Sequence, residues 1–313
     1  MPRDVIPWTL CVTNKNIMDY RKLFQVEPGK RVDLSDIDPS FHGKHVTEAQ
    51  AKAETEKHRE SISKLQDLLY SEGRHSLLIV LQAMDAGGKD GTVRHAMSTM
   101  NPIGTIVTSF KEPSAEDLKH DFLWRVHPHA PAKGMVAIFN RSHYEDVLVA
   151  RVHNLVPKTV WSERYSFIND FEKLLREQND TRVIKFFFYI SKEEQLNRFA
   201  ERLEDPARNW KISEADYRER EFWDDYIKAY EAVFRKTSTK PAPWYIIPAN
   251  HKWFRNLAVS QIVDATFQDM KIETPKPQVD LDLIKRQYHQ AEEEEMTSKS
   301  NGGGGRKRRK SGT

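Results

Sequence analysis

A continuous apolar run at Ser76–Gln82 is the feature that most constrains what this chain can fold into. A run of this length without polar alternation is typical of a strand buried on both faces of a parallel sheet. Four more strand-length apolar segments follow, separated by helical patterns: Thr105–Phe110, Met135–Phe139, Val183–Ile190 and Trp244–Ile247. The alternation predicts an α/β fold, a doubly wound parallel sheet of about five strands with helices on both faces.

Helical spacing of apolar residues fills the intervals between these strands and also precedes the first one. One such helix is expected over about 47–70, and another over about 89–100, directly after a glycine-rich turn. The polar residues expected to cap or begin the helices are Thr47, Ser114, Ser191 with Glu194, Ser213 with Asp216, and Asn250.

Composition divides the chain into three parts. Residues 1–45 contain four prolines and are expected to form an N-terminal arm with little regular structure. Residues 46–270 hold the alternation of strands and helices and form the main domain. Residues 271–313 form a C-terminal extension with a short amphipathic stretch near Leu281–Tyr288. Its last part, residues 296–313, is expected to be disordered.

The basic residues of the tail decide the sign of the net charge. The formal net charge is +3, which becomes −2 (44 basic against 46 acidic residues) without the five basic residues at 306–310. A near-neutral body is not expected to bind nucleic acid specifically, because such a body would carry a basic excess of its own. The basic cluster is interpreted as a solubilising end, although its composition also suits polyanion binding or a nuclear localisation signal.

Cysteine usage and apolar runs indicate a reducing compartment. Cys11 is the only cysteine, so no intrachain disulfide and no zinc site built from several cysteines is possible. The first residues lack the apolar core of a signal peptide, and no apolar run approaches the roughly 20 residues that span a bilayer. We therefore expect a cytoplasmic protein that does not enter a membrane.

The segment Ala83–Thr92 follows the first strand and resembles the phosphate-binding pattern G-x-x-x-x-G-K-[ST]. Small residues let backbone N–H groups wrap a phosphate at a helix N-terminus, and Lys89 adds a mobile positive charge. Ala83 replaces the first glycine, however, and Asp90 replaces the Ser or Thr that holds magnesium. A carboxylate beside a polyanion is repulsive unless a cation lies between them, so Asp85 is a candidate Mg²⁺ ligand. The plainer alternative is a glycine-rich turn without a ligand.

A second polar motif, Asn140–Asp146, follows the third strand. Asn140 holds the position of the metal-coordinating residue at the end of a Walker B strand, and Arg141 would point into the crevice of the phosphate loop. In the alternative interpretation Asn140 caps the next helix, and Arg141 pairs with Glu145 on the surface of that helix. The presence of both motifs at strand carboxyl ends favours a shared site.

Together the two motifs resemble the polyphosphate kinase 2 family, which is related in fold to thymidylate kinase and so to the P-loop kinases. Asp85–Gly91 matches its phosphate loop D-A-x-G-K-[DG]-G, and Asn140–Tyr144 matches its motif [DN]-R-S-x-Y. The continuation Glu145–Val149 is similar to the branch that accepts AMP and ADP. Further matches lie in order within residues 45–270: Met100–Pro102, Ser109–Lys111, His120–Arg125, Asn209–Lys211, Ser238–Lys240, Ala242–Tyr245 and Lys252–Asn256.

This resemblance implies reversible phosphoryl transfer between inorganic polyphosphate and a nucleotide, from AMP or ADP to ADP or ATP, with Mg²⁺ as the cofactor. Adenine or guanine nucleotides are the implied small-molecule partners, and a homo-oligomer, dimer or tetramer, is implied as the assembly. The preferred direction and the choice between AMP and ADP stay open at this point.

By resemblance, Asp85, Lys89 and Arg141 are the catalytic residues, and Asp85 binds the metal ion. A mobile helical lid is implied at about 191–221, where Arg198 and Arg202 lie four residues apart on one helix face and are suited to grip phosphates. The implied nucleotide- and phosphate-binding residues are Ala86, Gly87, Gly88, Lys89, Asp90, Gly91, Arg94, Asn140, Arg141, Glu145, Arg198 and Arg202. Acidic and basic residues are nearly balanced in the lid, so a solvated face with ordinary ion pairs is the alternative there.

Two other functions are consistent with parts of the sequence. An ATP-dependent nucleoside-monophosphate kinase of the thymidylate-kinase type would share the fold, but such enzymes usually retain the complete phosphate loop that this chain lacks. A non-catalytic binder of nucleotide or nucleic acid is supported only by the basic tail. In the leading hypothesis the acceptor phosphate is already ionised at pH 7, so catalysis depends on positioning and charge neutralisation rather than on a strong general base.

Overall fold

The computed structural model describes residues 18–43 and 47–302. The chain divides into two compact units, residues 1–273 and residues 274–313, and each is described by itself.

Five parallel strands form one sheet in the first unit. Their bounds are β1 Ser76–Ala83, β2 Thr105–Ser109, β3 Val136–Asn140, β4 Thr181–Tyr189 and β5 Trp244–Pro248. The order across the sheet is β2-β3-β1-β4-β5, so the winding reverses beside β1. The prediction of a doubly wound parallel sheet is confirmed. In such a sheet, ligands bind beyond the carboxyl ends of the strands at the point of reversal.

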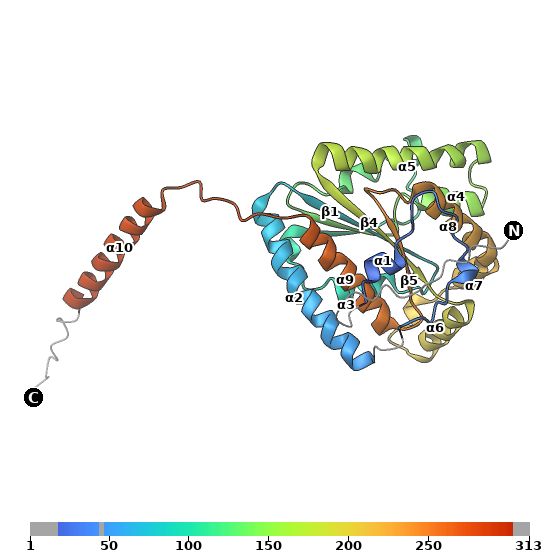
Figure 1. The fold of residues 1–313 in the computed structure, drawn as a ribbon, viewed down its shortest axis with the longest axis horizontal. Helices are drawn as coiled ribbons and strands as arrows, with labels where there is room; N and C mark the ends of the chain where they lie inside the picture. Colours follow the sequence, from blue (N-terminus) through green and yellow to red (C-terminus); the bar gives the residue numbers. More distant parts are fainter. Residues whose placement is uncertain (1–17, 44–46, 303–313) are drawn as a thin grey trace, which may run out of the picture. The chain divides into compact units, whose positions relative to one another are not determined.

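Helices cover both faces of the sheet (Figure 1). One face carries α1 Tyr20–Phe24, α2 Glu48–Glu72, α3 Lys89–Ala96 and α9 Lys252–Asp269, and the other carries α4 Glu145–Val152, α5 Lys158–Asn179 and α8 Trp223–Thr237. On the first face α9 packs against α1, α2 and α3, and on the second α4 packs against α5 and α8. Two further helices, α6 Lys192–Glu204 and α7 Glu214–Glu221, follow β4 and make up most of the segment expected to be the lid.

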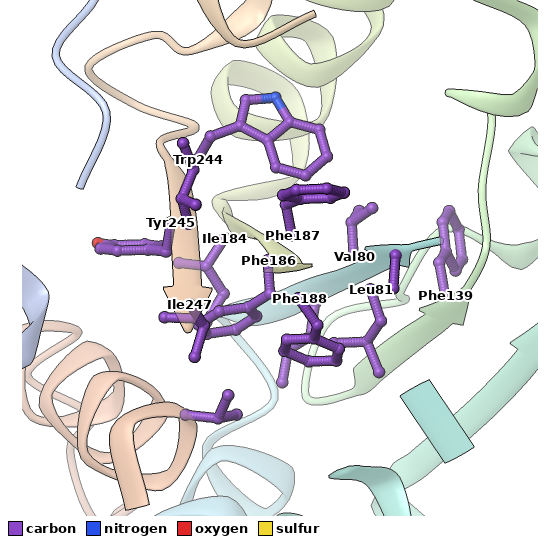
Figure 2. Close-up of a cluster of buried hydrophobic side chains, with 14 of the residues drawn as sticks. Val80, Leu81, Phe139, Ile184, Phe186, Phe187, Phe188, Trp244, Tyr245 and Ile247 are labelled. Carbon is purple, nitrogen blue, oxygen red and sulfur yellow. The ribbon is translucent and has the colours of Figure 1, made fainter. Parts of the chain in front are cut away.

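The core lies where the central strands meet these two helical layers (Figure 2). All eight residues of β1 are buried, as its unbroken apolar run predicts. In β4, alternate rings point to opposite faces: the Phe187 ring lies 4.2 Å from Tyr230 of α8, whereas Phe188 lies 5.8 Å from the Arg255 guanidinium of α9. A closely packed and mainly apolar centre therefore fixes the ends of β1 and β4, from which the loops of the site begin.

The predicted helix caps are confirmed in part. Thr47 with Gln50 and Ser213 with Asp216 form capping boxes at α2 and α7. The Ser191 hydroxyl accepts from the Glu194 N–H at 3.0 Å.

Asn250 does not cap the last helix of the core, so that prediction is wrong. His251 is the N-cap of α9, and the Asn250 Oδ1 accepts from the Ser191 N–H at 3.0 Å. The side chain thus joins the loop after β5 to the loop after β4. It is used in a tertiary contact because the two strands are neighbours and end at the same edge.

No helix begins at Ser114 in the described chain, so that prediction is also wrong. The Ser114 N–H and hydroxyl both donate to Asp117 Oδ2 at 2.8 Å, but only a short 3₁₀ helix, Asp117–Lys119, follows. Leu118 is 74% exposed, so the segment presents no apolar side chain to the core that would stabilise a longer helix.

The N-terminal arm is part of the core where the structure describes it. The prediction of little regular structure holds in that only α1 and a 3₁₀ turn, Leu34–Asp36, form. The segment nevertheless packs closely: Tyr20 and Phe24 are buried, and their rings lie edge-on to Phe254 of α9. The Val26 N–H also donates to the Trp244 carbonyl at 2.8 Å. Aromatic burial, which does not require regular structure, holds this segment in place.

The second unit contains one long helix, α10 Leu281–Gly302. The expectation of disorder from residue 296 is therefore wrong for 296–302, while residues 303–313, with the basic cluster, lie outside the described residues. Side-chain contacts four residues apart support the helix, such as Gln290 to Glu294 and Lys299 to Glu295. In the described part of the chain, no helix has the length and apolar content that crossing a bilayer requires.

Candidate active site

The carboxyl ends of β1, β2, β3 and β5 open into one large cleft of about 1360 Å³. The phosphate loop, the end of β3, the first residues of α9 and both helices of the expected lid contribute to its wall. Eleven Lys and Arg residues line it against seven Asp and Glu residues. A cleft with this excess of positive charge attracts and concentrates anionic substrates.

Steric limits fix the path of the phosphate loop at the end of β1. A Cβ on Gly87 would lie 2.4 Å from the Ala83 Cβ, so no side chain fits there. Gly88 has φ +98° and is the N-cap of α3, and Ala86 has φ +59°. No side chain caps α3, so its first N–H groups are left for a ligand at the edge of the cleft.

Lys89 lies on the first turn of α3, and its Nζ donates to the Ala83 carbonyl at 3.1 Å. Within the described chain no carboxylate forms an ion pair with this ammonium group. Burial, together with the nearby Arg141, lowers the pKa of Lys89 to about 8. The side chain is therefore a cation at neutral pH, but one whose charge a bound phosphate would strongly stabilise.

The two sequence motifs meet at the mouth of the loop. The Arg141 Nη2 donates to Asp85 Oδ1 at 3.1 Å, and the Asn140 amide donates to Asp90 Oδ1 at 2.7 Å. Arg141 also lies 3.7 Å from Glu145, which is the surface pair of the alternative interpretation. Asn140 does not cap α4, whose N-cap is Tyr144. Both interpretations of Arg141 therefore hold in part: it enters the crevice of the phosphate loop and also pairs with Glu145 of the next helix.

Burial and charge act against each other at this pair of motifs. Burial would lower the pKa of Arg141, but Glu145 and Asp85 outweigh it, so the pKa is raised above its ordinary value. Burial raises the pKa of Glu145, and Arg141 limits the rise. Arg141 is therefore firmly cationic, and its side chain, which is 44% exposed, lines the cleft.

A buried polar network that the sequence did not predict holds the second motif from behind. The Tyr144 hydroxyl donates to Glu172 at 2.8 Å, and Lys185 Nζ donates to Glu172 at 2.6 Å. Ser142 accepts from the Gln82 amide at 3.0 Å. The motif is thus fixed to β1, β4 and α5, which orients Arg141. A lysine inside the apolar run of β4 was the available signal, because a buried lysine requires a partner.

Arg198 lines the cleft, but its guanidinium is occupied by groups of the protein itself. Its side chain is 5% exposed and donates to Glu194 at 2.7 Å, to the Ala86 carbonyl at 2.8 Å and to the carbonyls of Ala249 and Asn250. These bonds tie α6 to the phosphate loop and to the end of β5. The geometry gives Arg198 a positioning role, while its predicted grip on phosphates stays a prediction.

Arg202 and Arg94 lie in the cleft wall. Arg202 donates to the Lys211 carbonyl at 3.0 Å and lies over the Phe199 ring. Arg94, on α3, is exposed. Their predicted contacts with substrate remain predictions.

Arg255 also lines the cleft, behind the phosphate loop, and was not among the residues predicted from the sequence. The signal that could have found it is the K-W-F-R-N segment at the start of α9.

The donor groups are compatible with magnesium bound through one or two carboxylates. In the described residues no group of three or more His, Cys, Asp or Glu side chains could hold a metal ion by itself. Mg²⁺ commonly takes one or two carboxylates together with water and substrate phosphates, so a complete protein cage is not required. Asp85 lines the cleft beside the phosphate loop and has a partly exposed carboxylate, so it fits this mode.

A parallel sheet whose central strand leads into a Gly-Lys loop at a helix N-terminus, inside a cationic cleft, defines a phosphotransferase of the phosphate-loop kinase class. The model of the family described as polyphosphate kinase 2 matches residues 45–275. The chain belongs to this family.

Individual relatives agree with this assignment. The AMP/ADP-polyphosphate phosphotransferase of Meiothermus ruber is 48% identical over 261 residues, which cover 82% of this chain and 96% of that protein. The ADP-polyphosphate phosphotransferase of Rhodopseudomonas palustris is 42% identical over 271 residues, covering 82% and 92%. The crystal structure of polyphosphate kinase 2 from Arthrobacter aurescens TC1 superposes with a TM-score of 0.80 at 39% identity and covers 85% of this chain and 98% of that one.

Proposed function

We propose that the protein transfers a phosphoryl group between inorganic polyphosphate and AMP or ADP, forming ADP or ATP, and that the reaction is reversible. The observation that carries this proposal is the pairing of Arg141 with Asp85 at the mouth of the phosphate loop. This pairing places a carboxylate and a guanidinium together where phosphates are expected. The Meiothermus relative, named for AMP and ADP, supports both acceptors, and the Rhodopseudomonas relative, named for ADP, supports ADP as an acceptor.

The chain's own residues supply positioning and charge. The N–H groups at the start of α3 and the Lys89 ammonium hold the phosphoryl group that is transferred. Arg141 faces the same space and neutralises charge on the transferring or accepting phosphate. The accepting phosphate oxygen is largely ionised at pH 7, because the second pKa of a phosphate is about 6, so no residue has to remove a proton.

Asp85 is the proposed holder of Mg²⁺. The bound ion would screen the negative charge of adjacent phosphate oxygens. Its carboxylate accepts a hydrogen bond from Arg141 at 3.1 Å and is partly exposed to the cleft, so it is oriented and still accessible to an ion. Asp90 has a different local role, because its carboxylate accepts from the Asn140 amide.

The finer details of the proposal follow from the family. Adenine nucleotides are the proposed acceptors, with guanine nucleotides as the second candidate. The proposed assembly is a cytoplasmic dimer or tetramer.

An ATP-dependent nucleoside-monophosphate kinase is the competing function. The loop argues against it, because Ala83 and Asp90 replace residues that ATP-donor enzymes usually retain.

The test is an assay with long-chain polyphosphate, MgCl₂ and either AMP or ADP, in which the nucleotide products are separated by chromatography and ATP is confirmed with luciferase. We expect ATP from ADP, and ADP followed by ATP from AMP, only when polyphosphate is present. Asp85→Asn should remove this activity, whereas Asp282→Asn, an exposed change on α10, should not. Phosphorylation of AMP by ATP without any reaction of polyphosphate would establish the competing function instead.

A further inference from the structure

Two arginines approach the phosphate loop at Gly88. Arg198 comes from α6 and Arg255 from α9. A Cβ built on Gly88 would lie 1.9 Å from Arg255 Nη1 and 3.7 Å from Arg198 Nη1, and a Cβ on Gly91 would lie 3.3 Å from Arg255 Nη2. The Arg255 guanidinium therefore lies directly against the N-terminus of α3, where the loop is built to receive a phosphate.

The two guanidinium groups differ in how their charge is balanced. Arg198 is paired with the Glu194 carboxylate and donates to three backbone carbonyls. Among the described residues, the Arg255 guanidinium donates only to the Asn256 side-chain oxygen, from Nε at 3.3 Å and from Nη2 at 2.9 Å. No carboxylate of the described chain lies within ion-pair distance of Arg255, and no described group accepts from its Nη1.

This unbalanced charge is buried. Arg255 is 2% exposed, and its guanidinium lies over the Phe188 ring of the core. Burial, followed by repulsion from Arg198, lowers the pKa of Arg255 to about 9, so the group is still charged at neutral pH. A buried charge without a counter-charge is costly, and an anion bound in the cleft that Arg255 lines would remove that cost.

We propose that Arg255 is a phosphate-binding residue of the active site, which completes the phosphate loop from the α9 side. Its ligand is the phosphate of the inorganic polyphosphate chain that lies on the N-terminus of α3. Nη1 of this planar guanidinium can donate to phosphate oxygens. It would contact the oxygens that face α9, which the backbone N–H groups of the loop do not reach. Arg198 serves a different purpose and positions the loop. The identity of the anion rests on the proposed function.

The test compares Arg255→Gln and Arg255→Lys with wild type, using inorganic tripolyphosphate as the probe. Calorimetry gives its dissociation constant, and steady-state assays give KM for polyphosphate and for ADP separately. Arg255→Gln should weaken tripolyphosphate binding and raise KM for polyphosphate by about tenfold or more, because a charged hydrogen bond is lost. Arg255→Lys should recover part of the loss, and KM for ADP should change less than about twofold. Arg176→Gln, on α5 outside the cleft, is the matched control.

Thermal unfolding of the ligand-free protein separates binding from a structural role. If the charge of Arg255 is balanced only by a bound anion, Arg255→Gln removes an unbalanced buried charge. The melting temperature without ligand should then stay the same or rise. The increase in melting temperature caused by tripolyphosphate should become smaller. A lower melting temperature in both variants, or failure to fold, would overturn the inference and assign Arg255 to the scaffold. Wild-type affinity in Arg255→Gln would also overturn it.

Failure of the proposed function gives a different result. If wild type makes no nucleotide product from polyphosphate, the proposed reaction is wrong, but loss of tripolyphosphate binding in Arg255→Gln would still establish the anion site. If wild type is active and Arg255→Gln has an unchanged dissociation constant and KM, only the role of Arg255 is wrong.

Discussion

Arg141 and Arg255 reach the same phosphate loop from opposite sides of β1, and their charges are balanced in contrasting ways. Arg141, at the end of β3, is partly exposed and pairs with Asp85 and Glu145. Arg255, on α9, is buried, and its hydrogen-bond partner within the described residues is the neutral Asn256 amide. The difference teaches that positive charge in one cleft can be prepared in two ways. On the β3 side, carboxylates of the protein balance and orient the charge of Arg141. On the α9 side, the charge of Arg255 is balanced only when an anionic ligand binds.

Replacement of Arg141 should have the largest effect. In Arg141→Gln we expect kcat to fall by about 10³-fold, because an arginine on the transferring phosphoryl group contributes at that level. Arg141→Lys should recover a small part. The measurement is steady-state kinetics with polyphosphate and ADP, side by side with Arg255→Gln. If the comparison holds, the loss lies mainly in kcat for Arg141 and mainly in KM for Arg255, and equal changes in both constants for the two variants would break it.

The pH dependence of Lys89 should have the next largest effect. Burial and Arg141 lower the pKa of Lys89 to about 8 in the free enzyme, so its positive charge is present below that pH and is lost as the pH rises through it. We expect kcat/KM for polyphosphate to fall about tenfold per pH unit above about pH 8. Arg in place of Lys89 should move this alkaline limb to higher pH. An unchanged limb in Lys89→Arg would show that another group sets it.

The smallest expected effect concerns the link that holds α9, and with it Arg255, to α2. His58 Nδ1 lies 2.7 Å from Asp264 Oδ2. Burial by itself would lower the pKa of His58, but the bonds to Asp264 and Glu54 outweigh it and raise the pKa to about 9. Because the folded pKa exceeds the unfolded value of about 6.5, this stabilisation is complete below pH 6.5 and is lost as the pH rises through 9.

His58→Asn should therefore lower the free energy of unfolding by about 1–3 kcal/mol at pH 6, and the difference from wild type should shrink towards pH 10. Urea unfolding at several pH values measures this. The dissociation constant for tripolyphosphate should stay within about twofold, because the pair stabilises α9 without contacting the loop. A pH-independent difference would indicate lost packing rather than lost charge.

Much of the fold was predictable because its signals are local. The apolar runs of β1 and β4 predict buried strands by themselves, and the Gly-Lys pair directly after β1 marks the phosphate loop. The meeting of Asp85 with Arg141 was predictable as well, because parallel strands end at the same edge of a sheet. The first two inferences need only one strand and its following loop, and the third adds only the rule that parallel strands share an edge.

The rest depends on contacts between distant segments. The sequence places Arg198 on a lid helix, but only the fold shows that backbone carbonyls after β1 and β5 occupy its guanidinium. The K-W-F-R-N segment marks the neighbourhood of Arg255, but the lack of a counter-charge at this residue appears only after α9 has packed. The close packing of the arm was not predictable for the same reason, since Tyr20 and Phe24 pack against Phe254 of α9 rather than against their neighbours in sequence.

The hydrogen bond from Val26 to Trp244 has a consequence for aggregation. Strand β5 lies at one edge of the sheet, and an open edge is a template for pairing with a second chain. The arm covers that edge through this bond and an antiparallel bridge between Gln25 and Tyr245. A truncated chain that starts at residue 45, where the family match begins, would expose both the edge and the aromatic surface of Phe254. The described part of the arm therefore covers an edge at which a second chain could otherwise pair.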